Sequence, residues 1–305
     1  MLDPRDLFEV VARPADLAPL DRPVLVQALD GFVDAGAAKA LAREHLLLGG
    51  SKVVARFDVD QLHDYRARRP LMVFAEDHWE SYADPELAVH LVEDAAGAPF
   101  LVLAGPEPDV QWERFVAAVQ LLVEELGVGL TVGLNSIPMA VPHTRPVGVV
   151  AHGSRPELAA GHESWVGTVQ VPGTAGHLLE HRLGQAGRDA AGFAVAVPHY
   201  LADTEYPAAA VVLLESLAAL TGLTLGTDEL GSSALTTRTA LDAQIAESPE
   251  VAAVVQALEQ QYDAFQAGRE RSLLGSDGAS LPTADELGAE LERFLAEQGR
   301  DGPSA

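Results

Sequence analysis

The chain of 305 residues contains no cysteine, which excludes disulfide bonds, thiolate zinc sites and cysteine nucleophiles. Lysine is almost absent, because Lys39 and Lys52 are the only two and arginine supplies the other positive charge. Apolar runs such as residues 208–214 fall far short of the ~20 residues that a membrane-spanning helix needs. The first residues, 1–6, lack the apolar segment of a secretory signal peptide, so we expect a soluble cytoplasmic protein.

Positive charge is scarce over the whole chain. Lysine and arginine together number 20 against 45 aspartates and glutamates, and the net charge is −25. Such a surface repels phosphate backbones and anionic membranes, so we expect neither nucleic acid nor a membrane as a partner. Other proteins and small ligands remain open as partners.

Negative charge is missing from one window, residues 126–156, where an even spread of the 45 acidic residues would place about four or five. Inside it, residues 135–146 carry three prolines together with a histidine and an arginine. Arginine pairs well with carboxylate or phosphate, and loops that follow parallel strands often bind ligands. The candidate ligand-binding residues are Asn135, His143, Arg145, His152 and His199. The alternative is a buried strand followed by a loop stiffened by proline.

Short apolar runs alternate with longer amphipathic segments through most of the chain. The runs typical of buried strands are 24–29, 52–59, 71–75, 100–104, 130–134, 147–151, 165–171 and 193–197. Helices are predicted for 34–48, 110–126, 174–187 and 207–220, with a short helix after Pro85. This alternation predicts an α/β fold, a layered sandwich with a mostly parallel central sheet.

The pattern changes near residue 231. From there on only helices and a loop are indicated: a helix begins at 248–250, a glycine-containing loop spans 273–280, and a capping box at 283–286 begins another helix. We therefore predict an α/β core domain over 1–231, a helical hairpin over 232–298 and a disordered tail over 299–305.

No catalytic motif is strong. His177 and His181 match the H-x-x-E-H pattern of inverted zinc peptidases, but the same segment fits an amphipathic helix, and we expect no metal. The loops 31–36 and 105–109 lie between a strand and a helix without fitting a phosphate-binding pattern. Asp34 and Asp109 there are expected to cap helices, and no cofactor is predicted.

Seven segments together resemble a known family. They are Gly31–Ala38, Gly105–Trp112, Gly133–Pro146, Val171–His177, Val197–Tyr200, Tyr206–Pro207 and Leu281–Leu287. Over about residues 20–297 the chain resembles the actinobacterial branch of the proteasome assembly chaperone 2 family. The resemblance implies an α/β core similar to nucleoside-phosphorylase-like folds, a following helical hairpin and homo-oligomers. It implies no catalytic residues.

The function expected from these observations is that of a non-enzymatic, homo-oligomeric interaction protein with an assembly-chaperone-like role. The alternative is a small-anion or nucleoside-like ligand-binding protein, or a hydrolase, with its site around residues 135–152. The sequence ends Gly302-Pro-Ser-Ala305, without the hydrophobic residue, tyrosine and final residue of relatives that dock on proteasome rings. Direct docking on the proteasome is therefore not expected. Residues 135–146 could face either a ligand or a neighbouring subunit, and the second is favoured.

Overall fold

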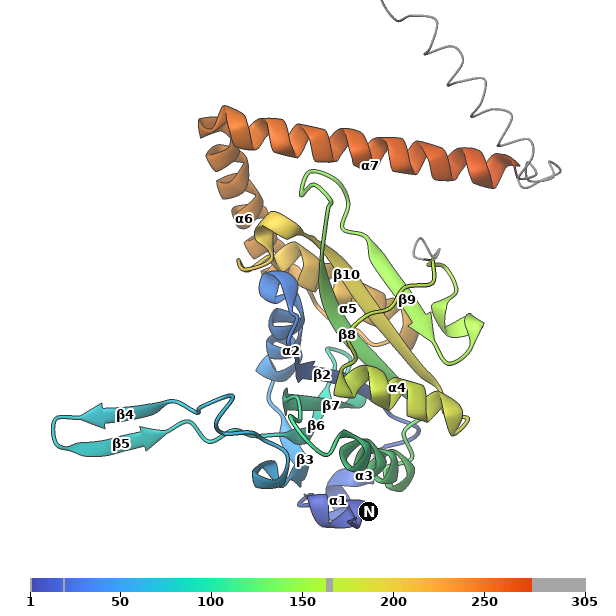
Figure 1. Ribbon diagram of the computed structural model, residues 1–305. Helices are drawn as coiled ribbons and strands as arrows, with labels where there is room; N and C mark the ends of the chain where they lie inside the picture. The colour runs from blue at the N-terminus through green and yellow to red at the C-terminus, as the bar shows by residue number, and fades with distance from the viewer. Residues whose placement is uncertain (1, 19, 163–166, 276–305) are drawn as a thin grey trace, which may run out of the picture. The chain divides into compact units, whose positions relative to one another are not determined.

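The structure is a computed structural model that describes residues 2–18, 20–162 and 167–275. The chain divides into two compact units, residues 1–256 and 257–305. The first unit contains an eight-stranded sheet in the order β1-β3-β6-β7-β2-β8-β10-β9. Figure 1 shows its strands and the helices around them.

Four parallel strands form the centre of this sheet. They are β7 (Pro99–Pro106), β2 (Val24–Asp30), β8 (Leu130–Met139) and β10 (Ala190–Pro198). The outer strands, each antiparallel to its neighbour, are β6 (Ala88–Glu93), β3 (Lys52–Phe57), β1 (Phe8–Val10) and β9 (Val149–Gly153). Because β3 and β7 both oppose β6, five strands run in one direction, which confirms the predicted mainly parallel sheet.

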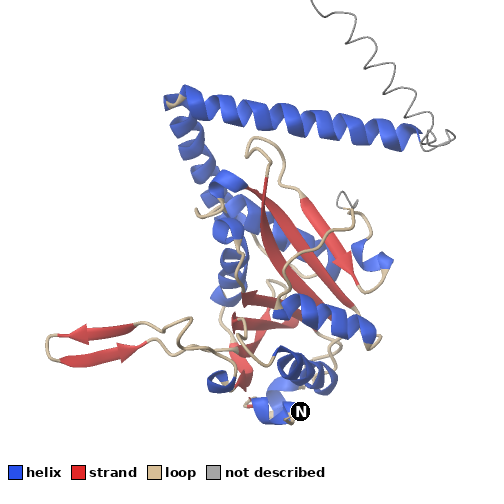
Figure 2. Cartoon of the chain, viewed as in Figure 1, coloured by secondary structure: helices blue, strands red, loops and turns tan. Residues whose placement is uncertain are grey.

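Helices cover both faces of the sheet (Figure 2). One face carries α2 (Ala38–Leu48) and α5 (Pro207–Thr221). The other carries α3 (Trp112–Glu125) and α4 (Ala175–Gln185), while a single turn, α1 (Pro14–Leu17), lies near the N-terminus. Since both faces are covered, the central strands consist of continuous apolar runs, which is why the sequence located them.

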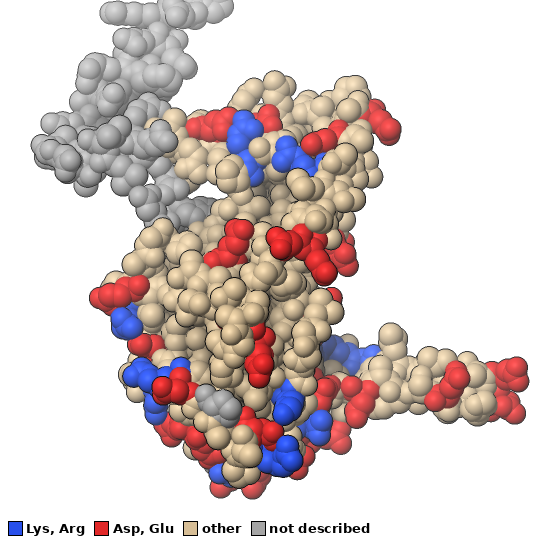
Figure 3. Space-filling view, turned by 180° about the vertical axis from the view of Figure 1, so that it is seen from behind, with Lys and Arg blue, Asp and Glu red and all other residues tan. Residues whose placement is uncertain are grey.

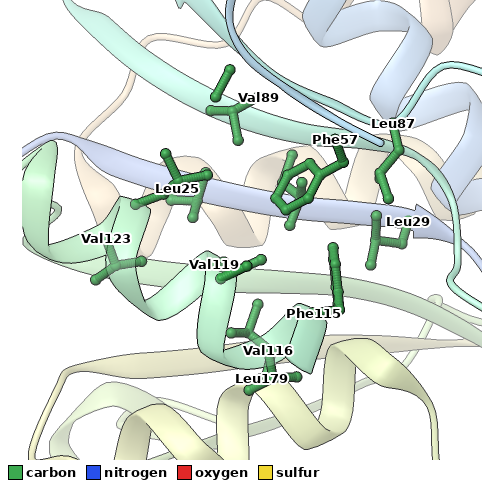
Figure 4. Close-up of a cluster of buried hydrophobic side chains, with 14 of the residues drawn as sticks. Leu25, Leu29, Phe57, Leu87, Val89, Phe115, Val116, Val119, Val123 and Leu179 are labelled. Carbon is green, nitrogen blue, oxygen red and sulfur yellow. The ribbon is translucent and has the colours of Figure 1, made fainter. Parts of the chain in front are cut away.

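The core lies in two layers, one on each face of the sheet. Leu25 and Leu29 of β2 point into the layer beneath α3 and α4, and Val26 points into the layer beneath α2 and α5. In the first layer Phe115 of α3 lies against Phe57 of β3, with ring centroids 5.2 Å apart (Figure 4). Each such buried side chain stabilises the fold by roughly 1.5–3 kcal/mol.

Polar caps fix where several helices begin and end. The Asp34 carboxylate accepts hydrogen bonds from the backbone N–H groups of Lys39 at 2.8 Å and Ala40 at 2.9 Å, as the predicted cap requires. Gly222, at a φ of 76°, ends α5. The cap predicted for Asp109 is wrong, because this carboxylate pairs with Arg68 at 2.7 Å and α3 begins only after Gln111.

Three other local predictions are wrong. One is the strand 165–171, because the described residues 167–171 form no strand. Residues after Pro85 form strand β6 between β3 and β7 instead of a short helix. Val89 packs into one core layer and Val92 into the other, in a segment too short for periodicity to decide. In addition, β8 continues to Met139, so the first part of residues 135–146 is paired strand instead of loop. Asn135 lies opposite Ala194 of β10 in that pairing.

A second, two-stranded sheet departs from the main one. It consists of β4 (Met72–Ala75) and β5 (His78–Tyr82), joined by a tight turn at Glu76 and Asp77. All residues of β5 and most of β4 are exposed. We call residues 71–83 the arm, and Figure 1 shows it extending away from the large sheet. The sequence predicted the first of its strands but not the second.

The C-terminal prediction is tested only in its first part. Helix α6 (Asp228–Glu247) packs against α5, and α7 (Pro249–Gly275) begins where a helix start was predicted. The predicted helix after residue 283 and the tail 299–305 lie outside the described residues. The boundary at 231, the helical hairpin and the similarity to nucleoside phosphorylases therefore stay predictions. Among the described helices, none combines the length and apolar composition that crossing a membrane requires.

Candidate functional site

A cavity of about 420 Å³ lies where β2, β7 and β8 end. The described residues that line it are Gln27, Leu29, Gly31, Phe32, Val33, Lys39, Glu107, Asn135, Ser136, Ile137, Pro138, Val150, His152, Val169, Val171, Pro172, Thr174, Gly176, His177 and Ala194. Carboxyl ends of parallel strands are the usual ligand position in open α/β sheets, and the volume suits a small molecule. Most of this lining is apolar.

The least expected residue of the lining is Lys39, on the first turn of α2. It is only 3% exposed. Its Nζ lies 3.5 Å from the position that a Cβ of Gly31 would occupy, at the cavity wall. Burial lowers the pKa of this amine, against the opposing effect of Asp34, Asp30 and Glu107. Within the described residues, no hydrogen bond or ion pair holds the ammonium group.

The carboxylates near Lys39 are each held by another donor. Asp30 pairs with Arg43, and Asp34 accepts a hydrogen bond from Ser136 Oγ at 2.7 Å besides capping α2. The Glu107 carboxylate accepts a hydrogen bond from the backbone N–H of Ala175, at the first turn of α4, at 2.5 Å. Burial raises the pKa of Glu107. The Lys39 amine is therefore left to face the cavity.

Imidazoles and an amide form the opposite side. Asn135 Nδ2 donates to His177 Nε2 at 3.3 Å, which requires this ring nitrogen to be unprotonated. Burial, assisted by the neighbouring His152, lowers the pKa of His177 and favours that neutral form. His152 Nδ1 lies 2.7 Å from Glu180 Oε1. The pair of His152 and Glu180 has the geometry of a base held by a carboxylate.

A glycine in β10 makes room for this pair. His152 of β9 lies opposite Gly192 in the antiparallel register. A Cβ at residue 192 would lie 2.3 Å from Cε1 of His152 and 3.0 Å from Oε2 of Glu180. Any side chain at position 192 would displace the imidazole and its carboxylate, so glycine is required there.

The five predicted ligand-binding residues do not come together. Asn135 and His152 line the cavity, whereas His143, Arg145 and His199 are absent from its described lining. His199 lies beside the ring of Tyr200, with centroids 5.5 Å apart. The residues do not converge because the loop after β8 places His143 against Tyr200 and Asp242 instead. Ligand binding by the five residues stays a prediction.

His143 instead joins two elements of the first unit. Its side chain is fully buried, with Nδ1 2.6 Å from the Tyr200 hydroxyl and Nε2 3.2 Å from Asp242 of α6. Arg238 donates to the His143 carbonyl at 3.0 Å. In the same loop, Arg145 lies 3.5 Å from the hydroxyl of Thr144. This loop therefore attaches α6 to the sheet.

Three residues of the cavity were missed by the sequence reasoning as ligand candidates: Lys39, Glu107 and His177. The available signals were the rarity of lysine in the chain and an acidic residue directly after the buried strand β7. For the H-x-x-E-H pattern, His177 contacts Asn135, whereas His181 Nε2 lies 3.1 Å from Gln185 of the same helix. No group of three or more potential metal ligands occurs in the part of the chain that the structure describes.

Comparisons with known proteins give consistent matches. A model of the PAC2 family matches residues 28–245. The crystal structure of a Mycobacterium tuberculosis protein of unknown function is 48% identical, with a TM-score of 0.81, over 86% of this chain and 92% of that one. A Corynebacterium glutamicum protein of unknown function is 38% identical, with a TM-score of 0.78, over 85% and 97% of the two chains.

A third solved structure is a proteasome-assembly chaperone homologue of Mycobacterium tuberculosis. It is 24% identical to this chain, with a TM-score of 0.70, over 76% of this chain and 99% of that one. At this identity the match shows a shared fold. No curated protein matches the chain.

Proposed function

Because this chain belongs to the PAC2 family, we propose that it is an assembly-chaperone-like interaction protein that works as a homo-oligomer. Its family and its similarity in fold to a proteasome-assembly chaperone homologue support the chaperone-like role. The net charge of −25 favours partner proteins with basic surfaces. The observation that carries the homo-oligomer is the arm.

One face of the arm is apolar and uncovered. Met72 lies opposite Tyr82 and Phe74 lies opposite Trp79, so these four side chains share one face. Phe74 and Trp79 are 56% and 62% exposed, and their rings contact each other edge to face at 5.1 Å. A two-stranded hairpin alone is only marginally stable in water. Such an apolar face is typical of an interaction surface.

Charge favours a second copy of the same chain as the occupant. The turn of the arm carries Glu76 and Asp77, while the segment before the arm carries the exposed Arg66 and Arg69. Figure 3 displays acidic side chains gathered at the end of the arm and basic ones near its base. When the arm of one copy lies along the arm of another, acidic tip meets basic base, and the same patch serves both copies.

Light scattering after size exclusion tests the oligomer, and at micromolar concentration we expect a mass above that of one chain. The charge argument is tested by Glu76→Arg with Asp77→Arg, which weakens association. Adding Arg66→Glu and Arg69→Glu to that variant restores it. A strictly monomeric wild type, or a fourfold variant that associates no better than the twofold one, contradicts the proposal.

The chaperone-like role has its own test. Affinity capture at low salt, with the purified oligomer as bait and the same protein carrying the arm substitutions as control, recovers specific partner proteins. Recovery of none under conditions that preserve the oligomer contradicts the role. The oligomer and the role can therefore fail separately.

The cavity supports a second candidate function, small-molecule binding at the carboxyl ends of β2, β7 and β8. Asn135 and His152 are the predicted residues that line it, together with Lys39, Glu107 and His177. The apolar lining and the nearby carboxylates favour a neutral ligand over the small anion that the sequence suggested. The Lys39 amine restricts the chemical class of this ligand further.

A further inference from the structure

A buried amine without a partner requires an explanation. An ammonium group removed from water destabilises the fold unless it is paired, and natural proteins rarely keep one unpaired. Lys39 is 3% exposed and lines the cavity with no hydrogen bond from its Nζ to any described residue. Methionine or leucine would fill the same space on α2 without that cost. The amine is therefore suited to a ligand.

The charge around Lys39 argues against an anionic ligand. The carboxylates of Asp30, Asp34 and Glu107 all act on the amine, and Arg43 is the other cation that does so. Three acidic groups against two basic ones leave the surroundings negative when all are ionised. A carboxylate or phosphate entering the cavity would be repelled, so the ligand is neutral.

The lining indicates what the body of the ligand is. Phe32, Val33, Ile137, Val150 and Val171 are among the side chains around the cavity. About 420 Å³ with apolar walls accommodates a small hydrocarbon or aromatic group. A single polar atom on that group would then lie between Lys39 and Glu107.

We propose that this cavity binds a small, neutral, apolar aldehyde or ketone, and that Lys39 holds it covalently as an imine. The inference rests on the second candidate function, ligand binding in the cavity. A lysine in apolar surroundings is the usual nucleophile for such a bond, because less of the amine is protonated there.

Glu107 is placed to move the protons. Its Oε2 lies 3.6 Å and Lys39 Nζ lies 3.5 Å from the same point, the missing Cβ of Gly31. The neutral amine attacks the carbonyl carbon, and the C=O π pair moves to the oxygen. That oxygen takes a proton from the protonated Glu107 carboxyl group, and the nitrogen then gives a proton to the Glu107 carboxylate. Glu107 then protonates the hydroxyl, water leaves as the nitrogen lone pair forms C=N, and the iminium proton returns to Glu107. Amine and carbonyl thus give imine and water.

The chain contains its own control for this chemistry. Lys52 is the only other lysine. Its side chain is 68% exposed and pairs with Asp16 at 3.1 Å. The purified full chain is incubated with benzaldehyde and sodium cyanoborohydride at pH 7, which converts an imine to a stable benzylamine. Peptide mapping by mass spectrometry then measures the initial rate of modification at each lysine separately.

We expect modification of Lys39 at least ten times faster than modification of Lys52. Lys39→Arg keeps the charge, cannot form an imine, and abolishes the adduct while Lys52 reacts as before. Glu107→Gln slows the reaction at Lys39 several-fold without changing Lys52. Equal rates at the two lysines, or faster reaction at Lys52, overturn the imine.

Reversible binding is measured separately, so that the two proposals can fail independently. Benzyl alcohol, which cannot form an imine, is expected to raise the melting temperature of both the wild type and Lys39→Arg, whereas benzoate raises neither. Stabilisation by benzyl alcohol without an adduct at Lys39 leaves a ligand site and overturns the imine. If benzyl alcohol does not stabilise and no adduct forms, both are overturned. Stabilisation by benzoate that Lys39→Met abolishes overturns the neutral ligand.

Discussion

The cavity and the arm depart from the usual distribution of side chains in opposite ways. The cavity buries a lysine that is 3% exposed, while the arm exposes a tryptophan that is 62% exposed. Neither arrangement stabilises an isolated chain, because a buried charge loses hydration on folding and an exposed aromatic side chain removes little apolar surface from water. The binding that we propose explains each of them, with a small molecule in the cavity and another chain on the arm.

The largest effect is expected when the arm loses its aromatic residues. Phe74→Ser with Trp79→Ser removes two anchors from the proposed contact between copies, and central aromatic residues contribute about 2 kcal/mol or more each. The dissociation constant of the oligomer should rise by a factor of at least about 100. A dilution series followed by light scattering measures it.

The control for that variant carries the same substitution at exposed leucines outside the arm. Leu48 and Leu235 are 74% and 73% exposed. Leu48→Ser with Leu235→Ser should leave the oligomer intact. If this control dissociates as readily as the arm variant, association depends on exposed apolar side chains in general and not on the arm.

The next effect concerns the glycine beneath His152. Gly192→Ala forces the imidazole and the Glu180 carboxylate to move, since the new Cβ would lie 2.3 Å from His152 Cε1. Overpacking of this kind destabilises by about 1–3 kcal/mol. Gly226→Ala is the control, because a Cβ there has no neighbour within 4 Å. Urea unfolding compares the two, and equal stability for both variants would contradict the packing at residue 192.

A smaller effect of opposite sign is expected at Lys39. Because burial lowers the pKa of this amine, the folded state disfavours its charged form. Lys39→Met fills similar space without charge and should stabilise the protein on the order of 1 kcal/mol at pH 7. Lys52→Met should change stability little, since its ion pair is exposed. A destabilised Lys39→Met would mean that the surrounding carboxylates need this cation.

The smallest effect is a pH dependence from His177. Its pKa in the folded state lies below the ordinary value of 6.5. As pH falls below 6.5, the unfolded chain therefore binds more protons than the folded chain does. Stability that is present above pH 6.5 is lost as pH falls from there to the lower pKa of the folded state. His177→Gln should lose less stability than the wild type between pH 7 and 5, by less than about 1 kcal/mol since the ring is partly exposed. Unfolding curves at several pH values measure the difference, and parallel curves would contradict it.

The elements of the large sheet could be predicted from the sequence better than the cavity and the arm. Strands such as β2 and β7 were found because helices cover both sheet faces and leave unbroken apolar runs. Asp34 was correctly predicted as a cap because its two capping bonds go to Lys39 and Ala40, which lie close to it in the sequence. The order of residues within short segments was therefore enough to predict these elements and several of their ends.

The cavity depends on relations that local chemistry does not contain. Glu107 approaches Lys39 only because β7 pairs with β2, and His152 meets Gly192 only in the register of β9 against β10. Asn135 and His152 were selected for their residue types, and so were His143 and His199, which lie elsewhere. The second strand of the arm was missed because residues 76–80 form a charged cluster directly after the predicted strand 71–75, although Trp79 within that cluster pairs with Phe74.

The position of β2 has a consequence for synthesis of the protein. This strand emerges from the ribosome early, yet both of its neighbours, β7 and β8, follow much later in the chain. About 100 residues separate β2 from β8, which at elongation rates of roughly 5–20 residues per second corresponds to about five to twenty seconds. Both edges of β2 lack a partner until β7 has been made, and the edge that pairs with β8 lacks one until β8 follows. One edge of β2 therefore stays unpaired until the chain has been synthesised past the residues of β8.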